Sequence, residues 1–427
     1  MPHILPFRGI TYNLPAVKLD DVVCPPYDII SNEYRDTLYE RHEYNFVKLD
    51  FAREENRYEV AKERFDDWSD EKILVQDERP AFYLLEQDFK VGERTHVRRG
   101  FIGLCKLEEL TETSSIRRHE KTLSKPKEDR LQLLSATDVH CSPVLSLFSD
   151  TDFFTDERME IFYREHTPLS EFVHEAVMHR VWKITEIPFI EKLIAALKAS
   201  DAVIADGHHR YETALNYQRL QQQKNPNHTG NEVYNFTMMY FANVQNEGLQ
   251  ILPTHRLVHS LPHFNEEIFL EEMKKYFYLR QYFSLTPMMK ALEEERYAIA
   301  FALPSVPTLF FAQLRDEKIL FETLQHIPAE LRKLDVTILH SLIFEQLLHI
   351  SKEQQEQKTN IHYEQDAFRA VMEIKNKQNV QAAFLLKATR VDQVFNVAMA
   401  GSTMPQKSTY FFPKLPSGIV LFDTKQF

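Results

Sequence analysis

The stretch AVIADGHHRYETALNYQ, Ala202–Gln218, carries the pattern from which the fold of this 427-residue chain can be inferred. Ala202–Ala205 is typical of a short apolar strand, Asp206–His209 of a turn, and the residues from Arg210 onward of an amphipathic helix. In such a unit the unpaired backbone N–H groups of the first helical turn point away from the sheet, and the helix dipole favours an anion there. The pattern predicts an α/β (α+β) fold with an anion-binding turn.

The polar residues of this turn suit a phosphate group. The chain has only 9 glycines, and Gly207 stands at the strand–helix junction, where it would let the backbone approach a ligand. Arg210 would supply a planar fork for phosphate or carboxylate. The alternative is a capping Asp206 with solvated histidines. We favour a site, in which the catalytic candidates are Asp206 and His209 and the phosphate-binding candidates are Gly207, His208 and Arg210.

A second polar stretch, RRHEKTLSKPKEDR, spans Arg117–Arg130. Phosphoryl transfer needs cations that neutralise phosphate oxygens and a carboxylate that accepts a proton or holds Mg²⁺. Glu120 is the predicted base, although a solvated charged loop would have a similar composition. The HExxH pattern of zinc proteases is excluded because residue 123 is Leu. The predicted phosphate-binding residues of this stretch are His119, Thr122, Lys125, Lys127 and Arg130.

Composition narrows the classes of function. The net charge of −12 and the pI near 5.9 argue against a broad nucleic-acid-binding face. The three cysteines, Cys24, Cys105 and Cys141, show no CxxC spacing and are expected to be free thiols in a reducing compartment. No apolar run reaches the length of a membrane span, and we expect a cytoplasmic protein. The phosphate-loop, GxGxxG, GxSxG and kinase HRD and DFG motifs are absent.

Several elements can be predicted around these motifs. Ser31 should cap a helix over Asn32–Arg41, which follows a proline-stiffened loop. That loop either is a simple turn that leads into the helix or contacts the substrate. Arg98 and Arg99 are expected to form a solvated pair on an edge strand. Leu252–Val258 (LPTHRLV) either closes over the site or is a polar turn, and we favour the turn. Further expected elements are a strand over Phe46–Phe51, a helix over Asn56–Asp70, hairpin strands over Ala81–Phe89 and Val97–Leu107 around Gly92, and a core strand over Tyr234–Asn243.

The pattern of helix-like and strand-like segments changes near Pro262. We therefore predict a first domain over residues 1–260 and a smaller α/β domain over residues 261–427. The polar loop Met404–Thr409 either packs back on the first domain or simply connects two elements. Expected elements of the second domain are helices over Glu266–Tyr278, Leu334–Leu348 and Asp366–Lys375 and strands over Tyr297–Ala302, Thr308–Leu314 and Val380–Leu386.

Five motifs occur in order along the chain: PPYDII, RHEKTLSKPKEDR, ADGHHRYETAL, LPTHR and MPQKSTYFFPKL. With these residues the chain resembles the bacterial and archaeal domain-of-unknown-function 1015 family. That family is grouped with ParB-like proteins, and DGHHR resembles the phosphate-binding Gly-x-x-Arg turn of the ParB/sulfiredoxin fold. The resemblance implies a ParB/sulfiredoxin-like nucleotide-binding core, in which Gly207–Arg210 would carry nucleotide phosphates.

The free-serine kinases have a very similar Asp-Gly-His-His-Arg turn and offer the closest functional analogy. We therefore expect an Mg²⁺-dependent phosphotransferase that uses ATP or ADP, with CTP as an alternative, and acts on serine or phosphoserine. Lys125, Lys127 and Arg130 would stabilise the transferred group, and Glu120 or Asp206 would accept the hydroxyl proton.

The sequence also leaves rival functions. One is a ParB-like switch that hydrolyses CTP or ATP slowly and acts through a protein partner, and another is a non-enzymatic interaction protein. The cysteine nucleophile of sulfiredoxins would fall within the turn, where His208 and His209 stand, so sulfinic-acid repair is excluded. No basic helix-turn-helix follows the turn, so nucleic acid is not an expected partner. A homodimer is left open.

Overall fold

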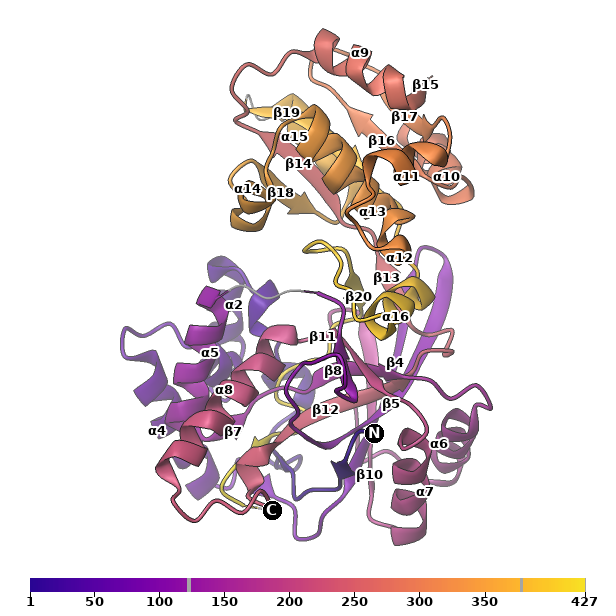
Figure 1. Ribbon diagram of the computed structural model, residues 1–427. Coiled ribbons are helices and arrows are strands. Elements are labelled where there is room, and N and C mark those ends of the chain that lie inside the picture. Colours follow the sequence, from indigo (N-terminus) through magenta and orange to yellow (C-terminus); the bar gives the residue numbers. More distant parts are fainter. Residues whose placement is uncertain (121–123, 377–378, 427) are drawn as a thin grey trace. The chain divides into compact units, whose positions relative to one another are not determined.

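The computed structural model describes residues 1–120, 124–376 and 379–426 (Figure 1). The chain divides into two compact units. Unit 1 comprises Met1–Arg118, Thr122–Gln250 and Pro413–Phe427, and unit 2 comprises His119–Lys121 and Ile251–Phe412. Each unit has a mixed α/β fold, the class expected from the sequence. The main part of unit 1 ends at Gln250 rather than at residue 260. Unit 1 also includes Pro413–Phe427, which the sequence places in the second domain.

Unit 1 is built on a mixed nine-stranded sheet. β11 runs parallel to β6 and antiparallel to β8, and β12 runs parallel to β8, whereas the other neighbouring strands are antiparallel. All eight residues of β12 are buried, which fits its unbroken apolar run. The strands, in sheet order, are β6 (Ile116–Arg118), β11 (Ala202–Asp206), β8 (Val144–Phe148), β12 (Phe236–Asn243), β5 (Arg94–Lys106), β4 (Phe82–Val91), β10 (Val177–Ile184) and β9 (Ser170–His174), with β1 (Ile4–Leu5) beside β5.

Three helices pack against the apolar residues of this sheet: α6 (Phe154–Glu165), α7 (Ile187–Leu197) and α8 (His208–Lys224). One buried cluster joins their side chains to those of Phe101 and Phe241 in the centre of the sheet. Helix α5 packs against α8 and α4. The remaining elements are α1 (Leu19–Val22), α2 (Asn32–Arg41), α3 (Val47–Asp50), α4 (Arg57–Asp70), α5 (Ser124–Thr137), β2 (Ile10–Tyr12), β3 (Leu74–Gln76), β7 (Val139–His140), β21 (Phe422–Asp423) and the short 3₁₀ turns η1 (Tyr27–Ile29) and η2 (Val233–Asn235).

Some predicted elements of unit 1 are confirmed. Ser31 caps α2, where its hydroxyl accepts a hydrogen bond of 3.2 Å from the backbone N–H of Tyr34. Gly92 lies between β4 and β5 with φ of 59°, as a hairpin glycine should. The predicted strand Phe46–Phe51 is wrong, because Val47–Asp50 is helical. The side chain of Asn45 accepts from the N–H of Val47 at 3.1 Å, and this local bond starts a helical turn in spite of the alternating pattern.

Unit 2 contains an antiparallel six-stranded sheet. In sheet order the strands are β15 (Phe277–Tyr282), β17 (Leu309–Leu314), β16 (Ala298–Ala302), β19 (Val380–Leu385), β14 (His255–His259) and β18 (Ile361–Glu364). The LPTHR segment is therefore not a polar turn, because its His255 and Arg256 lie in β14 and are buried. The remaining elements are β13 (Gln250–Leu252), β20 (Tyr410–Phe412), α9 (Glu266–Tyr276), α10 (Leu285–Glu294), α11 (Lys318–Thr323), α12 (Ala329–Arg332), α13 (Asp335–Thr337), the π-helix η3 (Ile338–Leu347), α14 (Lys352–Gln357), α15 (Ala367–Asn376) and α16 (Val391–Met399).

Successive side chains along the strands of unit 2 point to opposite faces of the sheet, and both faces are packed. Small residues such as Ala300 belong to the cluster that includes side chains of α10 and α15. Phe301 and Phe384 contact the aromatic rings of Phe269 on α9 and Phe344 on η3. The sheet thus holds η3 in place through aromatic packing. Among the described residues of both units, no helix combines the length and the apolarity needed to cross a membrane.

Candidate functional site

The DGHHR turn joins β11 to α8, as the sequence predicts, and the helix begins two residues earlier than expected. The pairing of β11 with β8 shifts register between Ile204 and Asp206, and such an irregularity redirects the side chain that follows it. Gly207 is the N-cap of α8 and has φ of 90°, a conformation that side chains with a Cβ rarely adopt. Gly207 offers no side chain to cap the first turn of the helix.

Asp206 is held between two cations. Its Oδ2 accepts a hydrogen bond of 2.8 Å from Arg210 Nη2, and its Oδ1 accepts one of 2.7 Å from Lys414 Nζ. Burial opposes ionisation of Asp206, but Lys414 and Arg210 together hold the pKa of its carboxyl well below the usual value. Asp206 is therefore an ionised carboxylate throughout the neutral pH range.

The guanidinium of Arg210 folds back over Gly207. Its Nη1 donates to Ser142 Oγ at 3.2 Å and to the carbonyl of Pro143. A Cβ atom at position 207 would come within 2.9 Å of the guanidinium of Arg210. Glycine is thus required here for two reasons, its positive φ and the space that the arginine occupies.

Lys414 is positioned by a buried arginine on the central strand β5. Arg98 Nη2 donates to the carbonyl of Pro413 at 2.6 Å, and Gln87 Nε2 donates to the carbonyl of Lys414 at 3.2 Å. Arg98 Nε also donates to Gln87 Oε1 at 2.9 Å. The predicted solvated pair on an edge strand is wrong: Arg98 is fully buried because β5 lies between β12 and β4, and Arg99 pairs with Glu86.

A second ion pair lies near the helix α5. Arg130 Nη1 donates to Asp50 Oδ1 at 2.9 Å, and its guanidinium lies 4.0 Å from the ring centroid of Tyr27. Ser417 Oγ donates to Asp50 Oδ2 at 3.0 Å. Burial raises the pKa of Asp50 above its usual value although Arg130 opposes the shift. A perturbed buried carboxyl of this kind is common at functional sites.

The two arginines, Arg130 and Arg210, line the same small cavity. Its volume is about 40 Å³, enough for one or a few water molecules. The cavity brings together the PPYDII loop, the second polar stretch and the DGHHR turn, three motifs that are far apart in the sequence. Its polar lining includes Tyr27, Asp50, Arg130, Ser142 and Arg210.

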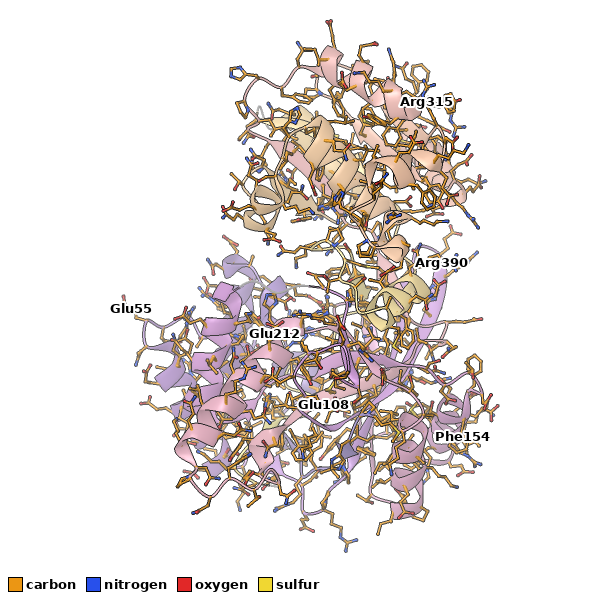
Figure 2. The ribbon with its side chains drawn as sticks, viewed as in Figure 1. Glu55, Glu108, Phe154, Glu212, Arg315 and Arg390 are labelled. Carbon is orange, nitrogen blue, oxygen red and sulfur yellow. The ribbon has the colours of Figure 1, made fainter. Side chains whose placement is uncertain are left out.

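Lys127 reaches the flank of α8. Its Nζ donates to Glu212 Oε2 at 2.8 Å, and Arg118 Nη1 lies 3.6 Å from Glu212 Oε1. Glu212, labelled in Figure 2, lies one turn into the helix. These cations of the second polar stretch therefore lie beside the helix whose N-terminus is the predicted phosphate site.

The other predicted site residues that the structure describes belong to both units. His208 is buried and His209 half-buried in the first turn of α8. His119 and Glu120 belong to unit 2, where His119 Nε2 forms a hydrogen bond of 2.9 Å with Thr409 Oγ1. Glu120 Oε1 accepts from the N–H of Lys407 at 3.4 Å. Thr122 and the side chain of Lys125 lie outside the described part of the chain.

Sequence reasoning did not identify Lys414, Asp50 or Tyr27 as site residues. A signal existed for two of them, because Tyr27 lies in PPYDII and Lys414 in MPQKSTYFFPKL. Asp50 lay in a segment interpreted as a strand. Within the described residues there is no group of three or more His, Cys, Asp or Glu side chains that could hold a metal ion by themselves.

No curated protein matched. Similar solved structures include a conserved hypothetical protein from Pyrococcus furiosus, at 14% identity and a TM-score of 0.35, covering 72% of this chain and 91% of that one. A free serine kinase in complex with ADP is similar at 11% identity and a TM-score of 0.35, covering 72% and 90%. C-terminally truncated SbnI from Staphylococcus aureus is similar at 10% identity and a TM-score of 0.32, covering 72% and 84%.

A protein-family model gives the broader match. The family described as "Protein of unknown function (DUF1015)" matches residues 4–337, which include the PPYDII, DGHHR and LPTHR motifs. The chain belongs to the DUF1015 family.

Proposed function

We propose that unit 1 is an Mg²⁺-dependent phosphotransferase. It transfers a phosphoryl group from ATP or ADP to the hydroxyl of serine, or, in the reverse direction, from phosphoserine to a nucleotide. The observation that carries the proposal is the N-terminus of α8, where Gly207 leaves the first turn without a side-chain cap and Arg210 lies beside it. A helix N-terminus combined with a guanidinium and an ammonium group, here Lys414, is suited to phosphate oxygens. The ParB/sulfiredoxin-like character of the core is part of the same proposal.

Asp206 is assigned an organising role in this proposal. A carboxylate with so low a pKa is a weak proton acceptor, so Asp206 is assigned to holding Arg210 and Lys414. The remaining lone pairs of its oxygens would be available to Mg²⁺. Mg²⁺ is commonly bound by one or two carboxylates together with substrate phosphates, and a single carboxylate at this turn fits that pattern. When bound, Mg²⁺ neutralises charge on the phosphate oxygens.

The proton acceptor is assigned to His209, which stands in the first turn of α8. Arg130 pairs with both Asp50 and Asp129, and its guanidinium lies over the ring of Tyr27. We therefore assign Arg130 to holding the loop that carries Tyr27 rather than to binding the transferred phosphoryl group. Lys127, whose side chain is 25% exposed beside Glu212, stays the candidate for the transferred phosphoryl group. The roles of His119, Glu120, Thr122 and Lys125 stay predictions.

A nucleotide-binding switch that works through a protein partner is the second candidate. The observation that favours it is the state of Asp206, whose two oxygens both accept hydrogen bonds from cations. That arrangement binds an anion without requiring an acceptor hydroxyl. Turnover of CTP or ATP that ignores serine would therefore support the switch.

Phosphorus NMR tests the proposed transfer. The protein is incubated with Mg²⁺ and ATP, ADP or CTP, with and without L-serine, and in reverse with phosphoserine and AMP or ADP. We expect a phosphomonoester signal that depends on serine, lost in Lys414→Met and retained in Lys425→Met. Lys425 is a matched control because it lies in the same C-terminal segment and pairs with Asp138 instead. Absence of the serine-dependent signal would reject the transferase.

A further inference from the structure

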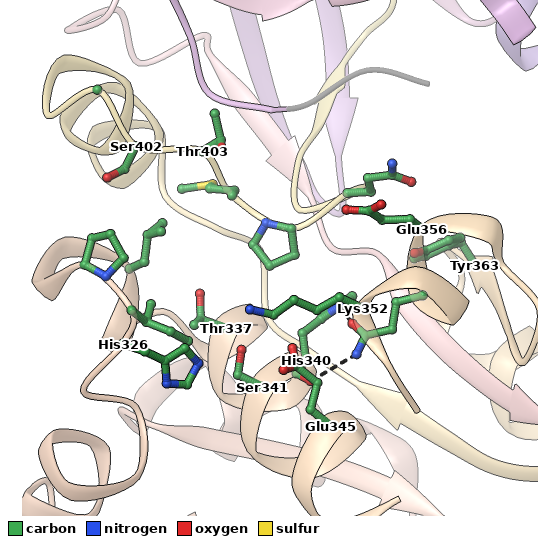
Figure 3. Close-up of a pocket in the computed structure, with 18 residues that line it drawn as sticks. His326, Thr337, His340, Ser341, Glu345, Lys352, Glu356, Tyr363, Ser402 and Thr403 are labelled. Carbon is green, nitrogen blue, oxygen red and sulfur yellow. Dashed lines mark hydrogen bonds between the residues drawn. The ribbon is translucent and has the colours of Figure 1, made fainter. Parts of the chain in front are cut away.

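Unit 2 contains a cavity that the phosphotransferase proposal does not use (Figure 3). Its volume is about 440 Å³, within the range of small-molecule sites. The lining residues come from the segment before α12, from α12 itself, from the end of α13, from η3, from α14, from Tyr363 on β18 and from the loop at 401–406. All of them belong to unit 2, so the cavity can be analysed within that unit alone.

One side of the cavity is formed by a π-helix. The N–H of Leu348 donates to the carbonyl of Ile343 at 2.9 Å, a five-residue spacing that closes the end of η3. Such helices are rare and recur at functional sites. Thr337, Ser341 and Glu345 follow one another at intervals of four residues, and all three line the cavity.

The floor of the cavity is held rigid by buried hydrogen bonds. Arg256 Nε donates to His340 Nε2 at 3.3 Å, and His340 Nδ1 donates to Gln355 Oε1 at 2.7 Å. Burial, with Arg256 beside it, lowers the pKa of His340 to about 3, so the ring is neutral. Gln355 Nε2 donates in turn to the carbonyl of Ile350 at 2.9 Å. These bonds fix α14 against η3, and His340 and Gln355, which make them, also line the cavity.

Opposite charges face the same space. Glu345 is half-buried on η3, and Lys352 extends from α14 toward the hydroxyls of Thr337 and Ser341 in Figure 3. Burial raises the pKa of Glu345, and the nearby Lys352 and His326 oppose that shift. A carboxylate and an ammonium that line one cavity can bind a ligand that itself carries both charges.

Two hydroxyl groups at this cavity lack a partner. Thr337 Oγ1 and Tyr363 Oη are buried and make no hydrogen bond within the described part of the chain. Thr337 as a whole is only 2% exposed. Buried hydroxyl groups are nearly always paired, so these two are available to a ligand.

The remaining wall of the cavity is apolar. Ile327, Leu331 and Met404 are buried there, and Pro328 and Pro405 stand beside them. This wall is suited to a hydrocarbon group. A ligand that fills the cavity should therefore have one zwitterionic end and one apolar end.

We propose that this cavity binds an α-amino acid with a large apolar or aromatic side chain. The α-ammonium group contacts Glu345, the α-carboxylate contacts Lys352 and the hydroxyl of Thr337, and the side chain lies against Ile327, Leu331 and Met404. The cavity is formed by residues of unit 2 alone, and the proposal does not depend on the proposed transferase.

Calorimetric titration of the full-length protein, without nucleotide or Mg²⁺, tests the proposal. The probes are L-phenylalanine, L-leucine and L-methionine at up to about 10 mM, a concentration at which a millimolar site also raises Tm measurably. Phenethylamine and 3-phenylpropanoate each lack one charge and should bind at least about tenfold more weakly than L-phenylalanine. Binding by none of the three amino acids, or binding of either analogue as tight as that of L-phenylalanine, would overturn the proposal.

Variants distinguish ligand binding from a structural role. Glu345→Gln and Lys352→Gln should each weaken binding about tenfold, whereas Glu293→Gln and Lys290→Gln, on α10 away from the cavity, should not. Thr337→Val keeps the shape of the side chain and removes an unpaired hydroxyl, so it should raise the Tm of the free protein while it weakens binding. Unchanged affinity in all three cavity variants would contradict the assignment. Retained binding in Arg210→Ala would separate this site from the proposed transferase.

Discussion

Gly207 and Gly230 have nearly the same backbone φ, 90° and 91°, but different surroundings. Alanine at either position is strained by about 1 kcal/mol or more. At position 207 alone the new methyl group would displace the guanidinium of Arg210, because it has open space at position 230. Gly207→Ala should abolish the nucleotide-induced rise in Tm, and Gly230→Ala should keep it, as thermal shift assays can show. Equal loss in both variants would mean that backbone strain, and not Arg210, is responsible.

Asp206 should contribute stability that depends on its charge. The pKa of the folded carboxyl lies below the value of about 3.8 expected for the unfolded chain, so the contribution is complete above that value and is lost as pH falls through the folded pKa. At neutral pH, Asp206→Asn leaves Lys414 and Arg210, both mostly buried, without their counter-charge, and we expect a loss of about 3 kcal/mol in unfolding free energy.

Urea denaturation at pH 7 and at pH 3 measures this effect. The difference between wild type and Asp206→Asn should be smaller at pH 3, because protonation of the unfolded wild-type carboxyl removes part of its advantage. A difference that grows toward pH 3 would contradict the assigned charge state.

At the residue scale, the sequence indicates only the contiguous part of the candidate site. Asp206, Gly207 and Arg210 could be assigned because strand, turn and helix follow one another directly. Lys414 could not, since its position depends on hydrogen bonds from Arg98 and Gln87 to a segment more than 300 residues away. Arg98 itself looks like a surface residue unless its strand is known to be central.

At the scale of single elements, helix α14 depends on a reciprocal cap. Ser351 Oγ accepts from the N–H of Gln354 at 3.2 Å, and Gln354 Oε1 accepts from the N–H of Ser351 at 2.8 Å. Ser351→Ala should destabilise α14 by about 1 kcal/mol. Because α14 carries Lys352, hydrogen exchange in its first turn should quicken and binding at the cavity of unit 2 should weaken. Ser31→Ala, which uncaps α2 in unit 1, is the control and should leave exchange in α14 unchanged.

Element boundaries were predictable where a cap or a long periodic run marks them, as for α2, α4 and β12. They were not predictable where a short-range bond overrides periodicity, as at Asn45, or where polar residues are buried by tertiary pairing, as for His255 and Arg256 in β14. The helix predicted over Leu334–Leu348 exists, but its π geometry has no signature in the apolar pattern.

At the scale of the whole molecule, neutral buried histidines should make stability fall in mild acid. His179 in unit 1 and His340 in unit 2 are almost fully buried. Burial, aided by nearby His174 and Arg98 for His179 and by Arg256 for His340, lowers the pKa of each to about 3. The unfolded rings titrate near 6.5, so the stabilisation is complete above pH 6.5 and declines below it by up to about 1.4 kcal/mol per pH unit for each ring.

Chemical denaturation at pH 7.5, 6 and 5 checks this expectation. His179→Gln should reduce the pH dependence of the unfolding free energy of unit 1, because one group that protonates only on unfolding is removed. Constant stability between pH 7.5 and 5 would show that these rings are not neutral and buried.

The sequence indicates a two-part chain, but it does not show that Pro413–Phe427 belongs to unit 1, because that placement depends on contacts of the folded sheet.

We propose that the N-terminus of α8 binds nucleotide phosphates through Arg210, and calorimetric titration with Mg²⁺ and ATP or ADP tests this binding most directly. Wild type and Arg219→Ala should bind equally, since Arg219 lies on the same helix and pairs with Glu109 at its exposed surface. Arg210→Ala should bind at least about tenfold more weakly, as expected for the loss of a charge-assisted contact. Equal affinity of Arg210→Ala and wild type, or no binding of either nucleotide to wild type, would contradict the account.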